Sequence, residues 1–102
     1  ALSIKERLNI ANNGYIEATI IITSDGTIYK KPILNFKGLP IYEKDDFKYG
    51  LEKELQKISK SFSLNNKKQE DNLIDALKIA CTKYSKEKTG KKPITIINLV
   101  RI

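Results

Sequence analysis

Two kinds of chemically versatile side chain are scarce in this sequence. Its 102 residues contain no histidine and a single cysteine, Cys81. Histidine is the commonest general base and metal ligand, and a zinc site needs several Cys or His ligands. A lone cysteine also cannot form an internal disulfide, which is typical of a reducing cytoplasm. We therefore expect a cytoplasmic chain with no catalytic residue, no metal ligand and no cofactor of its own.

Long hydrophobic runs are also missing. No run of about 18 apolar residues exists, so the sequence predicts no transmembrane helix and no membrane partner. A signal peptide is not expected, because Lys5, Glu6 and Arg7 stand where its apolar region would lie. The chain begins with Ala1 rather than Met, which favours a segment of a larger protein.

Basic residues are abundant. They outnumber acidic residues by 19 to 12, which gives a formal net charge of +7. Such an excess favours contact with nucleic acid or another anionic surface. The alternative is that these charges only keep the surface solvated. A general compositional bias towards Lys, Ile and Asn would explain the net charge without any binding partner. The length predicts one domain over residues 1–102, with residues 1–13 as a lead-in from an upstream linker.

The first half of the chain predicts a β-hairpin. Apolar and polar residues alternate over residues 15–23, which is typical of a strand. The Asp25-Gly26 pair predicts a tight turn, since Gly tolerates a positive φ. Residues 27–36 form the expected return strand. Pro32 within it has no amide hydrogen, so this strand should lie at a sheet edge.

Two amphipathic helices are expected next. The first has Asp45 as its N-cap and apolar residues spaced by three and four from Phe47 to Phe62, with Gly50 weakening its first turn. The second begins with Asn66 and Gln69 as a capping pair. Over residues 73–87 its apolar face consists of Leu73, Leu77, Ala80 and Tyr84, with Ile74 and Cys81 beside them.

The chain ends in a predicted strand. Gly90 follows the last periodic residue of the second helix, as a left-handed C-cap would, and Pro93 prevents a return to helix. Residues 94–102 are rich in Ile and Val. We expect an α+β fold of order β-β-α-α-β, with a three-stranded mixed sheet in the order 2-1-3 and both helices packed on one face.

Such a sheet leaves one face without helices. We expect Ile16, Ile20, Ile22, Ile94, Ile96 and Val100 to face the helices. Period two then places on the other face a candidate interface formed by Tyr15, Ile21, Tyr29, Ile33, Ile97 and Leu99. Exposed apolar patches usually mark interfaces. In the alternative, residues 1–10 fold across this face and cover it.

Five lysines gather near the end of the second helix and are candidate RNA contacts: Lys83, Lys86, Lys88, Lys91 and Lys92. The alternative is structural, because cations near a helix C-terminus complement its dipole. Cys81 lies on the apolar helical stripe, where a small core residue is expected rather than a nucleophile.

Several motifs occur in an order that resembles a known family. They are Gly14-Tyr15-Ile16 before the first strand, Lys31-Pro32-Ile33 through Gly38-Leu39 in the second, and Thr89-Gly90-Lys91-Lys92-Pro93 before the last. This order is similar to the C-terminal domain of ribonuclease J, a member of the metallo-β-lactamase/β-CASP ribonuclease family. The family has Thr-Gly-Arg-Arg-Pro in the last turn, so Lys91 and Lys92 replace both arginines. Phe36-Lys37-Gly38-Leu39 replaces its Ser-Arg-Gly-Phe.

The resemblance implies a parent enzyme that cleaves RNA with zinc ions held upstream of this chain. For the present domain it implies a non-catalytic role in subunit association and in support of the catalytic domains. The expected partners are the upstream catalytic domains and further copies of the chain, in a homo-oligomer, with RNA bound through the parent. The open alternative is a basic surface that guides RNA to the parent nuclease. An independent small enzyme is disfavoured by the absence of histidine.

Overall fold

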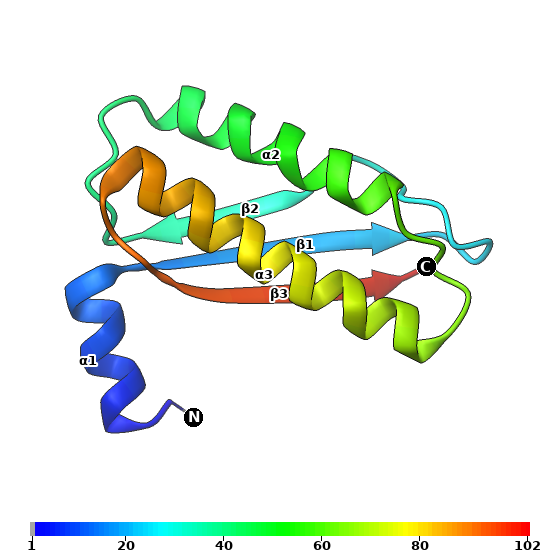
Figure 1. Cartoon of the computed structure of the whole chain (residues 1–102), viewed down its shortest axis with the longest axis horizontal. Helices are drawn as coiled ribbons and strands as arrows, with labels where there is room; N and C mark the ends of the chain where they lie inside the picture. Colours follow the sequence, from blue (N-terminus) through cyan, green and yellow to red (C-terminus); the bar gives the residue numbers. More distant parts are fainter. Residues whose placement is uncertain (1) are drawn as a thin grey trace.

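The computed structural model describes the backbone of residues 2–102, and their side chains apart from residues 9–11. It consists of two layers, in which two helices lie across one face of a sheet (Figure 1). The elements in chain order are α1 (Ile4–Asn13), β1 (Tyr15–Ile22), β2 (Ile33–Lys37), α2 (Lys44–Lys60), α3 (Lys67–Thr89) and β3 (Ile94–Arg101).

The three strands form one sheet in the order β2-β1-β3. β1 pairs antiparallel with β2 and parallel with β3, so the sheet is mixed. The two helices return the chain to the end of the sheet where β1 begins, which allows β3 to enter parallel to β1. The predicted α+β class and strand order are confirmed.

β1 lies at the centre of the sheet and alternates between the two faces. Ile16, Ala18, Ile20 and Ile22 are buried against the helices, and the residues between them are half-buried. The period of two in the sequence therefore predicted the buried face of this strand correctly.

β2 is shorter than the predicted strand over residues 27–36. The turn closes as expected at Gly26, whose φ is +85° and whose N–H donates to the Thr23 carbonyl (2.9 Å). Ile28 then bridges to Ile22, but the regular ladder with β1 resumes only at Ile33, after Pro32. Because proline cannot donate to a ladder, this interruption fits the position of β2 at the sheet edge.

α2 begins one residue after Glu43, which is its N-cap and makes no side-chain capping bond. The prediction of Asp45 as N-cap is therefore wrong. Asp45 and Asp46 lie in the first helical turn, where their negative charge complements the helix dipole. The helix buries Phe47, Leu51 and Leu55 as the spacing predicted.

α3 has both predicted caps. Asn66 Oδ1 accepts a hydrogen bond from the Gln69 N–H (2.9 Å), and Gly90 adopts a left-handed φ of 77°. The apolar face expected over residues 73–87 lies within this helix, which buries Leu73, Leu77 and Cys81.

Hydroxyl groups fix the turn between α3 and β3. Thr89 Oγ1 donates to the Ser85 carbonyl (2.8 Å) and accepts from the Lys91 N–H (3.1 Å). Ser85 Oγ donates to the Lys91 carbonyl (3.1 Å). These bonds satisfy backbone groups that the end of a helix leaves unpaired.

The N-terminal segment, expected as a lead-in, contains the helix α1. Ser3 and Glu6 cap α1 reciprocally: Ser3 Oγ accepts from the Glu6 N–H (3.1 Å), and Glu6 Oε1 accepts from the Ser3 N–H (3.3 Å). This Ser-x-x-Glu capping box was readable in the sequence. α1 extends away from one end of the sheet (Figure 1), so it does not fold across the helix-free face. Ala1 and the side chain of Ile10 lie outside the described residues.

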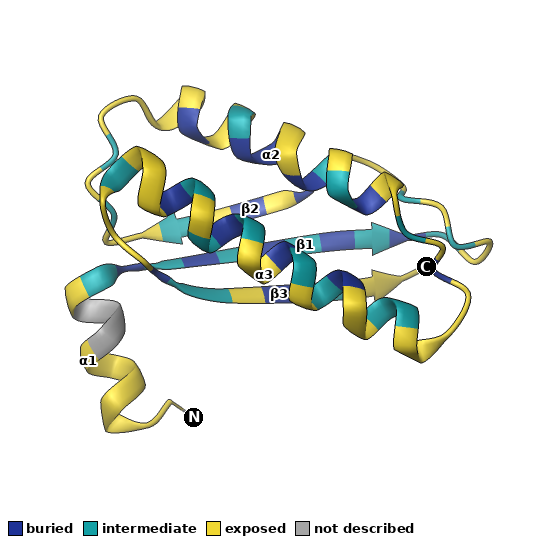
Figure 2. Ribbon diagram, in the orientation of Figure 1, coloured by how far each residue is buried: buried dark blue, intermediate teal, exposed yellow. Residues whose placement is uncertain are grey.

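The core lies between the two layers. Figure 2 shows that the buried stripes of α2 and α3 face the sheet, while their opposite sides are exposed. The residues of the core are Ile16, Ala18, Ile20, Ile22, Leu34, Phe47, Leu51, Leu55, Leu64, Leu73, Leu77, Cys81 and Ile97. Within the described part of the chain, no helix has the length and apolar character needed to span a membrane.

Candidate interaction surfaces

β3 presents the face opposite to the predicted one. Ile97 is only 9% exposed and belongs to the core, and Leu99 packs against the core. Ile96 and Val100 are instead exposed on the helix-free face, and half-buried Ile94 points to the same side. The expectation that Ile97 and Leu99 face outward is therefore wrong, as is the assignment of Ile94, Ile96 and Val100 to the helices.

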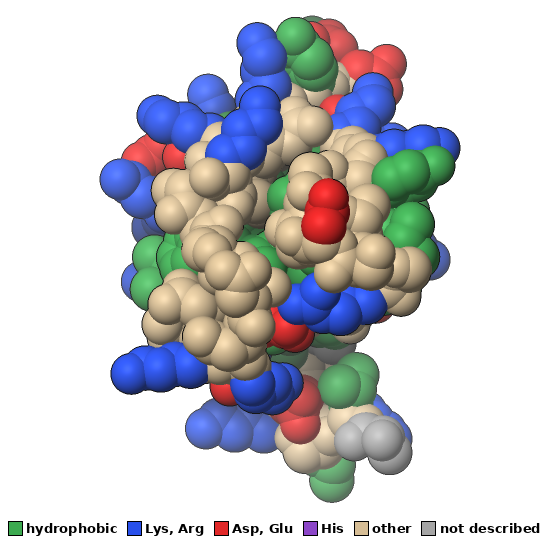
Figure 3. Space-filling view, turned by 90° about the vertical axis from the view of Figure 1, so that its right-hand side faces the viewer, with side chains coloured by type: hydrophobic (Ala, Val, Ile, Leu, Met, Phe, Trp, Pro, Cys, Tyr) green, Lys and Arg blue, Asp and Glu red, His purple; other side chains and the backbone are tan. Residues whose placement is uncertain are grey.

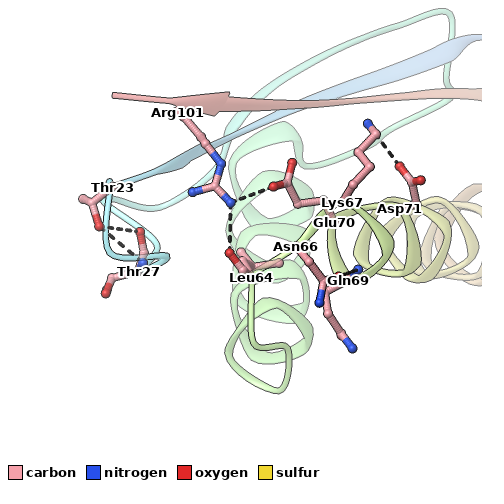
Figure 4. Close-up of polar contacts among 9 residues, drawn as sticks. All are labelled: Thr23, Thr27, Leu64, Asn66, Lys67, Gln69, Glu70, Asp71 and Arg101. Atoms are coloured by element: carbon pink, nitrogen blue, oxygen red, sulfur yellow. Dashed lines mark hydrogen bonds and ion pairs between the residues drawn. The ribbon is translucent and has the colours of Figure 1, made fainter.

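The register of β3 against β1 explains this correction. Ile97 lies opposite Ala18, and Leu99 lies opposite Ile20. Paired residues point to the same side of a sheet, so both follow their β1 partners towards the helices. At the strand's end, Arg101 Nη2 donates to Glu70 Oε2 in the first turn of α3 (2.6 Å) and to the carbonyl of Leu64, which precedes that helix (2.9 Å) (Figure 4).

The helix-free face, called here the outer face, has a polar centre. Asn98 Nδ2 donates to Glu17 Oε2 (3.2 Å) and to Thr19 Oγ1 (3.4 Å), which links β3 to β1. Apolar side chains surround this network on all three strands. The outer face consists of Tyr15, Glu17, Thr19, Ile21, Ile33, Asn35, Lys37, Ile94, Ile96, Asn98 and Val100.

Four of the six predicted interface residues lie on or beside the outer face. Tyr15 and Ile21 alternate with the buried residues of β1, and Ile33 is 52% exposed on β2. Tyr29 is exposed and donates its backbone N–H to the Ile21 carbonyl (2.8 Å). Their role in an interface stays a prediction.

All five candidate RNA-contact lysines are exposed at the C-terminal end of α3 or in the turn that follows: Lys83, Lys86, Lys88, Lys91 and Lys92. Two of them have structural contacts. Lys86 Nζ donates to the Gly90 carbonyl (3.1 Å), and Lys88 Nζ lies 5.7 Å from the centre of the Tyr84 ring. The five thus lie exposed at one end of α3 and in the turn after it, and their contact with RNA stays a prediction.

Positive charge is not confined to this cluster. Figure 3 views the other end of the molecule, where β1 and β3 terminate, and shows Lys and Arg side chains around its rim with Asp and Glu between them. A basic surface spread in this way is what general solvation would also produce.

Tyr84 and Gly50 form a contact that the sequence did not predict. Tyr84 Oη donates to the Phe47 carbonyl (3.1 Å), and its ring packs edge-on against Phe47. A Cβ atom at position 50 would overlap the Tyr84 hydroxyl, so the glycine makes room for the tyrosine. Partial burial, with the negative charges of Asp46 and Glu54, raises the pKa of Tyr84.

A cavity of about 240 Å³ lies beside this contact, at the start of α2 and the end of α3. Its wall is largely apolar and includes Ile41, Phe47 and Tyr84, and the charged residues Glu43, Asp46 and Lys88 also line it. No arrangement of nucleophile, base and acid accompanies it among the lining residues.

Burial raises the pKa of the Cys81 thiol from 9.0 to about 12. Such a thiol stays protonated at neutral pH, which favours a core residue over a nucleophile. Over residues 2–102, apart from the side chains of 9–11, no three His, Cys, Asp or Glu side chains are grouped to hold a metal ion.

Sheet, helices and surfaces together define a two-layer α+β domain with one helix-free sheet face. The chain matches the family model described as Ribonuclease J C-terminal domain over residues 2–102. Because this match spans essentially the whole chain, the chain belongs to that family. No curated protein sequence matches it.

Proposed function

We propose that this chain is a non-catalytic assembly domain of a cytoplasmic ribonuclease J-type enzyme, which associates with another subunit and supports the catalytic domains. The outer face is the observation that carries this proposal. It bears Ile33, Ile96 and Val100 at 52%, 36% and 43% exposure. Apolar groups gathered on one sheet face cost free energy in water, and burying them against a partner recovers it.

The family implies zinc-dependent RNA cleavage for the parent enzyme, and the residues of this chain do not fit a zinc site. Zinc prefers Cys and His ligands. The chain has no histidine, and its one thiol is buried and protonated. We therefore assign metal binding and hydrolysis to other domains, and assembly to this one.

A variant pair tests the assembly role. The double variant Ile96→Asp/Val100→Asp places charges on the outer face, whereas Ile79→Asp places one on α3, where Ile79 is 68% exposed. We expect the unaltered chain and Ile79→Asp to self-associate in high salt, and the double variant to remain monomeric, as measured by sedimentation velocity. Equal association of the double variant and the unaltered chain would exclude the outer face as the contact.

The lysine cluster supports a second candidate, an RNA-guiding surface. Five exposed lysines at one end of α3 are a geometry suited to phosphate contacts. Affinity for a short single-stranded RNA should then fall steeply with salt, and Lys91→Ala/Lys92→Ala should flatten that dependence. Lys67→Ala/Lys68→Ala, at the other end of α3, is the matched control. The same salt slope for both variants would assign the binding to overall charge.

A further inference from the structure

The two edges of the sheet differ in how they are protected from other strands. The β2 edge is short, follows Pro32 and ends at Lys37. β3 is longer, eight residues, and has no proline and no charged residue before Arg101. Proline, lysine and shortness are the usual devices against unwanted strand pairing. The sequence therefore protects one edge and leaves the other suitable for pairing.

Half of the β3 backbone groups point away from β1. The N–H groups of Ile94 and Ile102 donate to the Gly14 and Ile22 carbonyls of the β1 side. In a parallel ladder, alternate residues turn their N–H and C=O groups to opposite sides. Thr95, Ile97, Leu99 and Arg101 thus present theirs at the open edge. Within residues 2–102 no strand pairs there, and α1 lies only beside its start (Figure 1).

We propose that this open edge of β3 pairs antiparallel with β3 of a second copy of the chain, about a twofold axis at Asn98. This inference rests on the assembly role proposed above and specifies its geometry. The four open residues are placed symmetrically around Asn98. In this register Thr95 lies opposite Arg101 of the second copy and Ile97 lies opposite its Leu99, so every open N–H and C=O group finds a partner.

The side chains agree with the same register. On the outer face, Ile96 of one copy meets Val100 of the other, so two exposed apolar residues cover each other. On the inner face, Ile97 and Leu99 meet across the join, which continues the core from one copy to the next. The two Asn98 amides meet at the axis.

Charge favours the antiparallel direction over the parallel one. Lys91 and Lys92 lie just before β3 in each copy, with only Pro93 between them and the strand. Parallel pairing would stack these lysines about 5 Å apart, the usual strand spacing. Antiparallel pairing about Asn98 places the two Lys92 residues twelve positions apart, about 40 Å along the strands, which exceeds the screening length of about 8 Å at physiological salt.

The proposed pairing also leaves no unprotected sheet edge for a third copy. Two copies form a continuous six-stranded sheet whose outer edges are both β2, the protected edge. A twofold contact uses the same surface on both copies, so it ends at a dimer instead of growing into a fibre. The second copy of this chain is thus the occupant that fits the edge.

Disulfide cross-linking tests the register. Opposed residues of a non-hydrogen-bonded pair have Cα atoms about 4.5 Å apart, within the range a disulfide spans. We expect Asn98→Cys to give a cross-linked dimer under mild oxidation, because residue 98 faces itself. Ile96→Cys and Val100→Cys should give none singly, whereas the variant carrying both should cross-link. Cys81 can remain, since it is buried.

Amide hydrogen exchange of the unaltered chain gives a second readout that needs no substitution. At high concentration, the N–H groups of Ile97 and Leu99 should exchange slowly and become faster on dilution. Those of Ile96 and Val100, which point towards β1, should stay slow throughout. A chain that associates without either signature overturns the edge pairing and leaves the assembly role intact. A chain that stays monomeric overturns the assembly role itself.

Discussion

Tyr84 donates its hydroxyl proton to the Phe47 carbonyl directly above the backbone of Gly50, which joins the end of α3 to the start of α2. The ring makes edge contacts with Phe47, which in turn contacts Phe36 of β2. The φ of Gly50 is not positive, so the backbone conformation does not require glycine there. Glycine is needed because a side chain at position 50 would overlap Tyr84. One missing side chain thus lets three elements pack together.

Replacing Gly50 by alanine should destabilise the domain in spite of the better helix propensity of alanine. Propensity favours the change by about 1 kcal/mol. Overlap with the Tyr84 hydroxyl and loss of its hydrogen bond should cost more, for a net loss of about 1–2 kcal/mol. Chemical denaturation of Gly50→Ala measures this difference.

A double-mutant cycle identifies the cause. Tyr84→Phe removes the overlapping hydroxyl, so Gly50→Ala should cost clearly less in the Tyr84→Phe background than in the original chain. Gly90→Ala is the control, because its cost comes from a φ of 77° with no atom within 4 Å of the added carbon. Additive effects of Gly50→Ala and Tyr84→Phe would contradict the steric explanation.

The sequence predicted the elements with clear local signals. Each of these signals depends on the conformation of only a few neighbouring residues. They are the alternation in β1, the two caps of α3 at Asn66 and Gly90, and Pro32 before the edge strand β2. The Ser3–Glu6 capping box was equally local and was overlooked. These features need no knowledge of distant contacts, since backbone geometry and hydrogen bonding fix them.

The face of β3 depended on distant contacts and was assigned wrongly. Apolar residues occur at both odd and even positions of this strand, so alternation alone allows two solutions. Asn98 was the informative residue, because an amide facing the helices would need a buried partner. It faces outward with Glu17 and Thr19. The steric role of Gly50 likewise could not be predicted locally, because it depends on Tyr84, which lies 34 residues away in the sequence.

The same substitution at two neighbouring residues of β3 should destabilise the domain to very different extents. Leu99→Asp places a charge against the core and should cost about 2–4 kcal/mol of unfolding free energy. Val100→Asp, with Val100 on the outer face, should cost about 1 kcal/mol or less. Thermal or chemical unfolding of the two variants compares them directly. If Val100→Asp were the more damaging, the register of β3 would be refuted.

The Arg101–Glu70 ion pair should contribute modestly to stability and depend on salt. Both side chains are partly exposed, at 41% and 20%, so screening limits the pair to about 0.5–1 kcal/mol. We expect Arg101→Gln to lose that amount at low salt and less at high salt. Lys67→Gln breaks the more exposed Lys67–Asp71 pair and should change stability by less than about 0.5 kcal/mol. Equal losses for both would argue against a special role for Arg101.

Stability should fall at alkaline pH partly through Cys81. Its thiol ionises near 9.0 in the unfolded chain and near 12 in the folded one. Between these values the unfolded chain binds fewer protons, so the stabilisation present below pH 9.0 is lost as pH rises towards 12, by at most about 1.4 kcal/mol per pH unit. Cys81→Ala should therefore lose less stability than the original chain over this range. Parallel pH profiles would show that the thiol does not contribute.

The most direct test of the assembly role is the molecular mass of the unaltered chain in solution. Light scattering measures this mass over a concentration series. High salt screens the charge repulsion expected from a net charge of +7, so any association that remains comes from the apolar contact. We predict that the mass rises from 11.6 kDa towards twice that value as concentration increases. A mass that stays at 11.6 kDa up to millimolar concentration would contradict self-association through this sheet.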